Sequence, residues 1–379
     1  MINSSFLKRV LTFFAACVLS TTLTFADYNS QGGYPERCDP CYNPCKTCDP
    51  CDPCPEPCCE PCDPCGMTCG GFEVGVDFIF WQPCFNDLSY AILFDTNPNA
   101  SGSVTAHGKY QYLDHCFDPG FRVYAKKLDA WCGWDVSGSY TFYWSKASHS
   151  VSRVSPQELY STLDHGGFDL TAQSITSIEA SHNVRYQSFD ALFHYELNCC
   201  GPCHSLTPFW GIEGVKLEQD IFSTATGESS EQSATYNVNW DSELLGLGMK
   251  LGTDYYYKLM CGLSWFTRAS VTVLAGRNES TNTQIRTVQP TPVITNIPFK
   301  TCDDVCVPGF HLMAGLSYEK EWCGKTLKAR IGYEFLDWWN VPQIRRFTDG
   351  GNDIAISTSG PNGSNLGLHG LFVGLELGY

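Results

Sequence analysis

Positive charge is scarce in this sequence of 379 residues. It contains 24 Lys and Arg against 40 Asp and Glu, which gives a formal net charge of −16 at pH 7, and only 17% of its residues are charged. Proteins that bind nucleic acids need a basic face to neutralise phosphates. The composition therefore argues against a nucleic acid as partner.

Long apolar runs are missing after the first 26 residues. A membrane-spanning helix needs about 18 or more consecutive apolar residues, and no later stretch supplies them. The first stretch has an apolar run behind Lys8 and Arg9 and ends in Thr24-Phe25-Ala26. This layout is typical of a secretory signal peptide. We predict that residues 1–26 are removed and that the mature chain leaves the cytoplasm without a helical anchor.

Motifs for catalysis and cofactor binding are also missing. The chain has no HExxH zinc motif, no GxSxG nucleophile motif and no phosphate-binding Gly-Lys loop. A Ser–His pair could still form between neighbouring strands, for example at His194, but nothing in the sequence selects one. We therefore expect no enzyme activity, no metal and no cofactor.

Beyond Gly70, apolar and polar residues alternate with a period of two. In "GFEVGVDFIFW" (71–81) aromatic and branched residues occupy alternate positions, with Glu73 and Asp77 between them. The same alternation recurs in "WDVSGSYTFYW" (134–144), "QSFDALFHYEL" (187–197) and "TLKARIGYEF" (326–335). Such alternation predicts strands with one apolar face.

These strands indicate a transmembrane barrel rather than a soluble sandwich, the alternative that also alternates. They run for about 10 to 15 residues, which exceeds the usual soluble strand and suffices to cross a bilayer at a tilt. Their polar face carries glycine and full charges, as expected of a wet lumen. The chain ends in "GLFVGLELGY", which alternates up to its last aromatic residue. It resembles the signal read by barrel-assembly machinery, carried here by Leu375, Leu377 and Tyr379.

Loop lengths predict an antiparallel up-and-down topology for residues 71–379. Short connections alternate with long polar ones, as in barrels with short periplasmic turns and long outer loops. There are ten strands, or twelve if residues 84–113 add a hairpin, and an even number places both barrel ends in the periplasm. The long loops are predicted at 146–183, 223–239, 277–307 and 340–365. The strands are predicted at 72–82, 119–128, 131–145, 184–197, 205–221, 240–256, 262–276, 308–320, 325–338 and 366–379.

Strand parity predicts which polar side chains line the lumen. Lining charges tune ion selectivity, although opposite charges could instead pair across the interior and plug it. A single histidine in such a place is more often a satisfied lumen residue than a ligand. The candidates are Glu73, Asp77, Arg122, Lys126, Asp190, His194, Glu196, Lys328, Arg330 and Glu334.

Cysteine and proline dominate residues 27–70. Most steps between cysteines are three residues, and proline precedes most of them. Polyproline II has three residues per turn and rises about 3.1 Å per residue. Neighbouring thiols then lie roughly 9 Å apart, beyond the Cα separation of about 4.4–6.8 Å that a disulfide needs. A second chain could meet them, which predicts a non-globular periplasmic cross-linking arm. Its cysteines are Cys38, Cys41, Cys45, Cys48, Cys51, Cys54, Cys58, Cys59, Cys62, Cys65 and Cys69.

Two other interpretations of the arm remain open. Cys-Asp-Pro-Cys could turn tightly and close its own disulfide. CxxC pairs also occur in zinc sites, although no histidine lies between Cys38 and Cys69 and exported proteins meet an oxidising environment.

The cysteines outside the arm divide by position. Cys302 and Cys306 are predicted to form a local bridge in an outer loop, and Cys84 and Cys116 flank the first loop and could pair. The others lie near predicted periplasmic turns and could join the network of the arm; they are Cys132, Cys199, Cys200, Cys203, Cys261 and Cys323.

In their order and spacing, several segments resemble the major-outer-membrane-protein-like porins of the Chlamydiae and the related Legionella pore-forming outer membrane proteins. The resemblance spans Gly71 to Tyr379 and leaves the arm uncovered. It implies an outer membrane barrel that passes small solutes and has no catalytic site, and it makes disulfide cross-links in the envelope plausible. The segments are "DFIFWQPCFNDLSYAI", "DPGFRVYAKKLDAWCGWDVSGSYTFYWSKAS", "SLTPFWGIEGVKLEQD", "LLGLGMKLGTD", "GLSWFTRASVTVLAG", "LKARIGYEFLDWWN" and "NLGLHGLFVGLELGY".

We therefore predict an outer membrane porin for passive diffusion of small hydrophilic solutes and ions, tied to the envelope by disulfides. Its partners would be lipid, the barrel-assembly machinery, and other envelope proteins or further copies of itself, and a homo-oligomer would be compatible with this role. The alternative is a structural envelope protein or adhesin with a plugged barrel and no transport role.

Overall fold

The computed structural model describes residues 71–85, 88–95, 107–131, 133–163, 174–197, 203–228, 233–289, 293–322, 325–342 and 363–379. The predicted signal peptide and arm lie outside these residues. Every named element of the described part is a strand, and no helix there is long and apolar enough to traverse a bilayer. The strands are β1 (Phe72–Phe85), β2 (Ser89–Asp95), β3 (His107–Tyr112), β4 (Asp118–Trp131), β5 (Trp134–Ser152), β6 (Glu158–Ser161), β7 (Ser174–Tyr195), β8 (His204–Glu228), β9 (Ser233–Met260), β10 (Leu263–Gln289), β11 (Val293–Trp322), β12 (Lys325–Pro342) and β13 (Gly363–Gly378).

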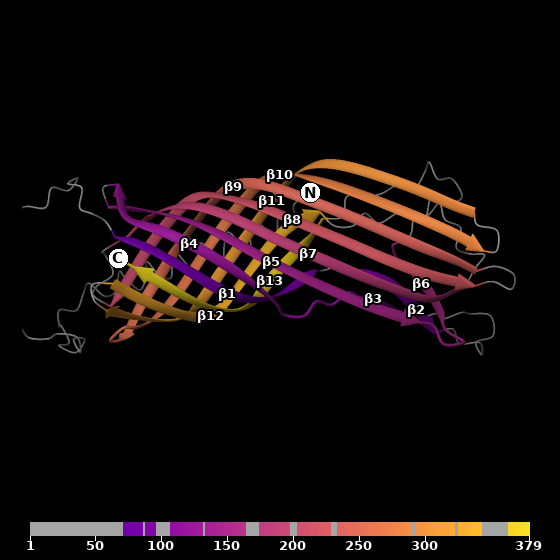
Figure 1. The fold of residues 1–379 in the computed structure, drawn as a ribbon, viewed down its shortest axis with the longest axis horizontal. Coiled ribbons are helices and arrows are strands. Elements are labelled where there is room, and N and C mark those ends of the chain that lie inside the picture. Colours follow the sequence, from indigo (N-terminus) through magenta and orange to yellow (C-terminus); the bar gives the residue numbers. More distant parts are fainter. Residues whose placement is uncertain are drawn as a thin grey trace, which may run out of the picture. The chain divides into compact units, whose positions relative to one another are not determined.

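Ten of these strands form a closed antiparallel barrel, which confirms the predicted fold class and the lower strand number (Figure 1). The order around the wall is β1-β13-β12-β11-β10-β9-β8-β7-β5-β4, and β4 pairs with β1 to complete it. The two ends of the barrel segment meet where β1 pairs with β13, because Phe72 and Tyr379 exchange backbone hydrogen bonds of 2.7 and 3.0 Å. We call this end of the barrel the near end and the opposite end the far end.

The twelve-strand alternative was wrong. Residues 84–113 do contain two strands, β2 and β3, but these pair with β6 in a separate sheet of order β3-β2-β6, here called the small sheet. Leu88, Tyr90 and Ala91 are all buried there, so successive residues lack the apolar–polar alternation of a wall strand. Leu159 of β6 joins them in a core with the barrel residues Ile178, Ile221, Ala225, Tyr236, Val238 and Trp240.

Two of the long loops, 223–239 and 277–307, were predicted wrongly, because the wall strands extend far into them. β8 continues to Glu228 and β9 begins at Ser233, so most of the predicted 223–239 loop is paired strand. β10 and β11 likewise pair from Arg277–Asp304 out to Val288–Val293. In these extensions the phase of the alternation is reversed, because apolar residues such as Tyr236 and Trp240 point inward and polar ones such as Asn239 point outward. A search for strands with an apolar outer face therefore underestimates strand length here.

The predicted faces of the wall strands are confirmed. Phe78 on β1 is 57% exposed and Leu245 on β9 is 61% exposed, whereas the adjacent Asp77 and Leu244 are buried. At these positions apolar side chains cover the outside of the barrel and charged ones such as Asp77 point inside, the inverse of a soluble protein. Farther along the strands the outer face also carries charges, such as Lys216 and Glu243. Beside the charges, the interior holds a cluster that we call the aromatic layer, which includes Trp81, Tyr143, Tyr186, Phe266, Trp338 and Phe372.

Candidate functional site: the charged barrel interior

The first group of buried charges is centred on Arg122 of β4. Its Nη2 lies 2.9 Å from Glu334 Oε2 and its Nη1 lies 3.4 Å from Asp77 Oδ2. Arg330 Nη2 contacts the other oxygen of Asp77 at 2.9 Å, and His311 Nε2 lies 3.1 Å from Glu334 Oε2. Two cations and a histidine therefore share two carboxylates contributed by β1 and β12. We call these five residues the arginine cluster.

A glycine makes room for the arginine cluster. Gly374 of β13 is the register partner of Asp77 across the β1–β13 pair. A Cβ at residue 374 would overlap Asp77 Oδ1. Any larger residue would therefore displace this carboxylate from Arg122 and Arg330.

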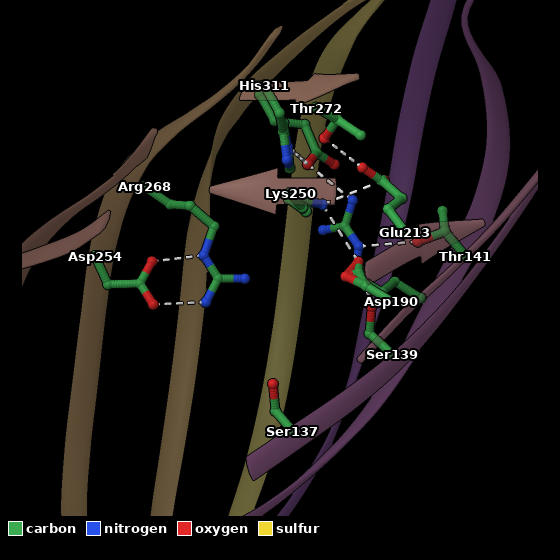
Figure 2. Close-up of polar contacts among 12 residues, drawn as sticks. Ser137, Ser139, Thr141, Asp190, Glu213, Lys250, Asp254, Arg268, Thr272 and His311 are labelled. Carbon is green, nitrogen blue, oxygen red and sulfur yellow. Dashed lines mark hydrogen bonds and ion pairs between the residues drawn. The ribbon is translucent and has the colours of Figure 1, made fainter. Parts of the chain in front are cut away.

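The second group surrounds Lys250 of β9. Its Nζ lies 3.2 Å from Glu213 Oε1 on β8 and 3.4 Å from Asp190 Oδ2 on β7 (Figure 2). Thr272 donates from its hydroxyl to Glu213 Oε2 at 2.6 Å, and Ser139 donates to Asp190 Oδ2 at 2.9 Å. One ammonium thus neutralises two carboxylates that the neighbouring hydroxyls also solvate. We call these five residues the lysine cluster.

Further ion pairs lie between these clusters and the near end. The guanidinium of Arg268 donates two hydrogen bonds, of 2.5 and 2.7 Å, to the carboxylate of Asp254. Lys126 Nζ lies 2.7 Å from Asp135 Oδ2, and partly exposed side chains make this pair wetter than the two clusters. The remaining charges near this end are Lys328, which lies 3.7 Å from Glu376, and Glu73, the half-buried register partner of Lys126.

The two clusters leave almost no room for water at their level. The side chains of Asp77 and Glu334 are 1% and 0% exposed, and those of Lys250 and Glu213 are 6% and 4% exposed. Side chains that lined an open aqueous pore would be far more accessible. Barrels of about eight strands are just filled by their side chains, whereas 16–18 strands leave a channel. This ten-stranded barrel is closed at its clusters and at the adjoining aromatic layer.

Ser137, His194 and Asp254 meet in an arrangement that suggests a catalytic triad. Ser137 Oγ lies 2.7 Å from His194 Nε2, but His194 Nδ1 is 3.9 Å from Asp254 Oδ2. That separation is too long for a hydrogen bond, and both oxygens of Asp254 are taken by Arg268. The imidazole therefore lacks the orienting carboxylate that activates a serine. His194 is a hydrogen-bonded interior residue.

Nine of the ten residues predicted from parity to line the lumen have side chains that contact or face other interior groups. The exception is Glu196, which follows the last residue of β7, is exposed, and accepts a 2.9 Å hydrogen bond from Ser205. Strand parity no longer applies to it because the wall strand ends at Tyr195.

Several interior residues were not predicted, although their positions along the strands place them inside. Alternate residues of β9 point outward, namely Leu245, Leu247, Met249 and Leu251. This spacing already places Lys250 inside. The same rule locates the others, which are Glu213, Asp254, Arg268, Thr272 and His311.

The predicted bridge between Cys302 and Cys306 is wrong. Both residues lie on β11 with exposed free thiols, and Cys302 accepts a hydrogen bond from Arg277 Nε at 2.7 Å. Residues four apart on a strand are separated by about 13 Å, which no disulfide spans. Cys84 and Cys116 are also free thiols and do not pair with each other.

The remaining predicted residues lie towards the near end of the barrel or outside the described part of the chain. Leu375 and Leu377 point outward from β13, and Tyr379 follows that strand at the near end. Cys203 and Cys261 lie beside the short connections at this end. The arm cysteines and Cys132, Cys199, Cys200 and Cys323 lie outside the described residues. In the described part of the chain, no group of three or more His, Cys, Asp or Glu residues is arranged to hold a metal ion.

Comparison with solved structures finds other outer membrane proteins. The outer membrane protease OmpT from Escherichia coli is 10% identical with a TM-score of 0.37, and the match covers 82% of this chain and 97% of that one. A major outer membrane protein from Thermus thermophilus is 12% identical with a TM-score of 0.26, covering 81% and 99%. A FadL homologue from Pseudomonas aeruginosa is 8% identical with a TM-score of 0.21, covering 82% and 90%. These scores are too low to bear on function.

No curated protein matches the sequence significantly. A family model does match, over residues 64–378, which include all ten strands of the barrel. The model describes the Legionella pneumophila major outer membrane protein precursor. Family membership agrees with the closed barrel, its apolar outer face and its charged interior, and it localises the protein to the outer membrane. The chain belongs to the Legionella major outer membrane protein family.

Proposed function

We propose that this outer membrane barrel is a porin with a narrow, closed lumen that passes ions and small hydrophilic solutes when its arginine and lysine clusters separate. The observation that carries the proposal is the placement of several charges inside the wall, each held by partners on other strands. Well-packed apolar residues usually fill an interior at least as stably as buried ion pairs do. A barrel with only a structural role gains little from such charges, whereas a polar path needs them.

The near end faces the periplasm in this proposal, since both ends of an even-stranded barrel lie on the side from which the exported chain inserts. Solutes would meet the partly exposed pair Lys126–Asp135 before they reach the two clusters. Each cluster contains at least as many carboxylates as permanent cations, so passing cations would be favoured over anions.

Conductance in planar lipid bilayers tests the porin directly. The purified chain is expected to show small stepwise currents. The substitution Lys250→Met leaves Asp190 and Glu213 without their shared cation, so their repulsion should enlarge the steps and increase cation selectivity. Lys216→Met is the matched control, because Lys216 is partly exposed on the outside of β8 and pairs there with Glu218 and Glu243.

A second function is favoured by the aromatic layer, whose large side chains are fully buried across the lumen. It is a structural envelope barrel with no transport. Absence of current from both the wild type and the Lys250→Met variant, in preparations that resist unfolding like a native barrel, would favour this function over the porin.

We also propose that the arm at residues 27–70 joins the protein to other envelope proteins or to further copies through disulfides. The support is the three-residue cysteine period, which separates neighbouring thiols along one chain. Envelopes separated by electrophoresis without reductant should contain high-molecular-weight species that collapse to monomer when reductant is added. Replacing the arm cysteines by serine should abolish them, and a ladder that persists in this variant would exclude the arm as the linking segment.

A further inference from the structure

The segment 113–117, which connects the small sheet to β4, is attached to the barrel through His115. The imidazole of His115 is buried, and the backbone carbonyl of this residue accepts a 2.6 Å hydrogen bond from the side-chain amide of Gln82 on β1. Its ring atoms contact two wall strands. Nδ1 lies 2.7 Å from Ser145 Oγ on β5, and Nε2 lies 3.0 Å from His182 Nδ1 on β7.

The hydrogen bonds define the proton positions on both imidazoles. Ser145 donates its only hydroxyl proton to Asp118 Oδ2 at 2.7 Å, so His115 must donate to Ser145 from Nδ1. In a neutral imidazole the other nitrogen is then an acceptor. His115 Nε2 therefore accepts from His182 Nδ1, and His182 Nε2 is an unprotonated nitrogen. That atom is buried and has no hydrogen-bond partner.

A second proton on either histidine disrupts this arrangement. On His115 the proton must bind Nε2, which either places two N–H groups against each other or moves the His182 proton to its buried Nε2, where it has no acceptor. On His182 it must bind the buried Nε2, where the new charge would have neither a partner nor water. Two neutral histidines thus form a connection that exists only in one protonation state.

We propose that the His115–His182 pair is an acid-sensitive latch, which holds the small sheet and the 113–117 segment against the barrel wall at neutral pH and releases them in mild acid. The latch does not depend on transport, because its direct consequence is the detachment of a defined part of the structure. It would give the far end of the barrel a response to the acidity of the medium.

The charged groups around the two imidazoles do not cancel the effect of acid on the latch. Asp118 and Asp114 are the carboxylates that face His115, and they oppose the loss of its positive charge. Burial outweighs them and lowers the pKa of His115 from 6.5 to about 4. His182 faces His115 and the ring of Phe85, 5.0 Å away between centroids, and gains no carboxylate partner.

The sign of the pH effect follows from these partners. A released His115 titrates near 6.5 and a latched one near 4, so between these values the released state binds more protons. Acid in this range therefore favours release, and the latch is fully engaged above pH 6.5. For His115 alone, release becomes about 30-fold more favourable at pH 5 than at pH 7.5.

Amide hydrogen exchange on the purified full chain in detergent micelles, with reductant present, measures release at each pH after correction for intrinsic exchange rates. Peptides from β2, β3 and residues 113–117 should lose about 30-fold in protection between pH 7.5 and pH 5. Peptides from the β9–β10 ladder provide an internal reference that should not change. Equal changes in the small sheet and in this ladder would overturn the proposal.

The substitution His115→Gln tests the residue itself, because an amide can still donate to Ser145 and accept from His182 but does not titrate. The protection of this variant should depend less on pH than that of the wild type, because only His182 still titrates on release. His204→Gln is the control, since His204 lies at the near end, where it contacts Tyr255, and the dependence should persist. If His115→Gln does not fold, His182→Gln replaces it with the same expectation. An unchanged pH dependence in the folded glutamine variant would refute the latch.

Discussion

The two halves of the barrel interior stabilise polar groups in different ways. Towards the near end, full charges are paired, as in the contacts of Arg122 and Lys250 with two carboxylates each. Towards the far end, the described polar groups that meet inside do so without ion pairs, as in the 3.0 Å contact of His115 with His182 and the guanidinium of Arg286, which lies over the ring of Tyr236. The small sheet and its apolar core occupy this second half.

This difference determines what each half responds to. A paired charge is held by opposite charges and stays ionised over a wide range of pH, so the clusters react mainly to the loss of a partner. A buried neutral histidine is held by hydrogen bonds that one proton abolishes, so the far half reacts to acid. One barrel therefore combines a region sensitive to substitution with a region sensitive to pH.

The largest expected effect comes from removing one cation from the near half. Lys250→Met leaves Asp190 and Glu213 buried without a counter-charge, and breaking a buried pair in this way typically costs about 3–5 kcal/mol. Lys216→Met removes an exposed pair on the outside, where the loss is no more than about 1 kcal/mol. Urea unfolding in detergent, followed by the mobility shift of the folded barrel on gels, measures both.

Equal losses for the two lysine variants would contradict this comparison. They would mean that water reaches Lys250 and screens its carboxylates as it does on the outside. The interior would then be open at the lysine cluster in the folded ensemble, and the closed lumen would not describe the protein in solution.

The faces of the strands could be predicted from the sequence, and the contacts between strands could not. Lipid requires apolar residues on one face, so alternation from Phe72 to Phe80 already reveals the inside and the outside. The pairing of Arg122 with Glu334 depends on how β4 and β12 are staggered when the barrel closes. No local spacing encodes that stagger for residues 212 positions apart.

The far half was harder to predict for a different reason. Beyond the apolar outer surface, the apolar residues of β8 and β9 point inward and the polar ones outward, so the strands continue to Glu228 and from Ser233 through a stretch that looks like a polar loop. The small sheet is short and buried, and its residues follow neither period. Predicting it requires knowledge of the apolar inner faces of β7, β8 and β9, against which it packs.

The smallest expected effect concerns the second contact of the small sheet. Tyr90→Phe removes the hydroxyl that meets His149 Nδ1 at 2.6 Å and keeps the buried ring in the core. A hydrogen bond of this kind contributes about 1 kcal/mol, so β2 should lose roughly fivefold in exchange protection at neutral pH while the β9–β10 ladder is unchanged. Tyr110→Phe is the control, because Tyr110 on β3 is half exposed. If Tyr90→Phe also lowers protection in β9 and β10, the small sheet and the wall unfold together. The two halves would then form one cooperative unit, and an acid-sensitive latch could not act on the far half alone.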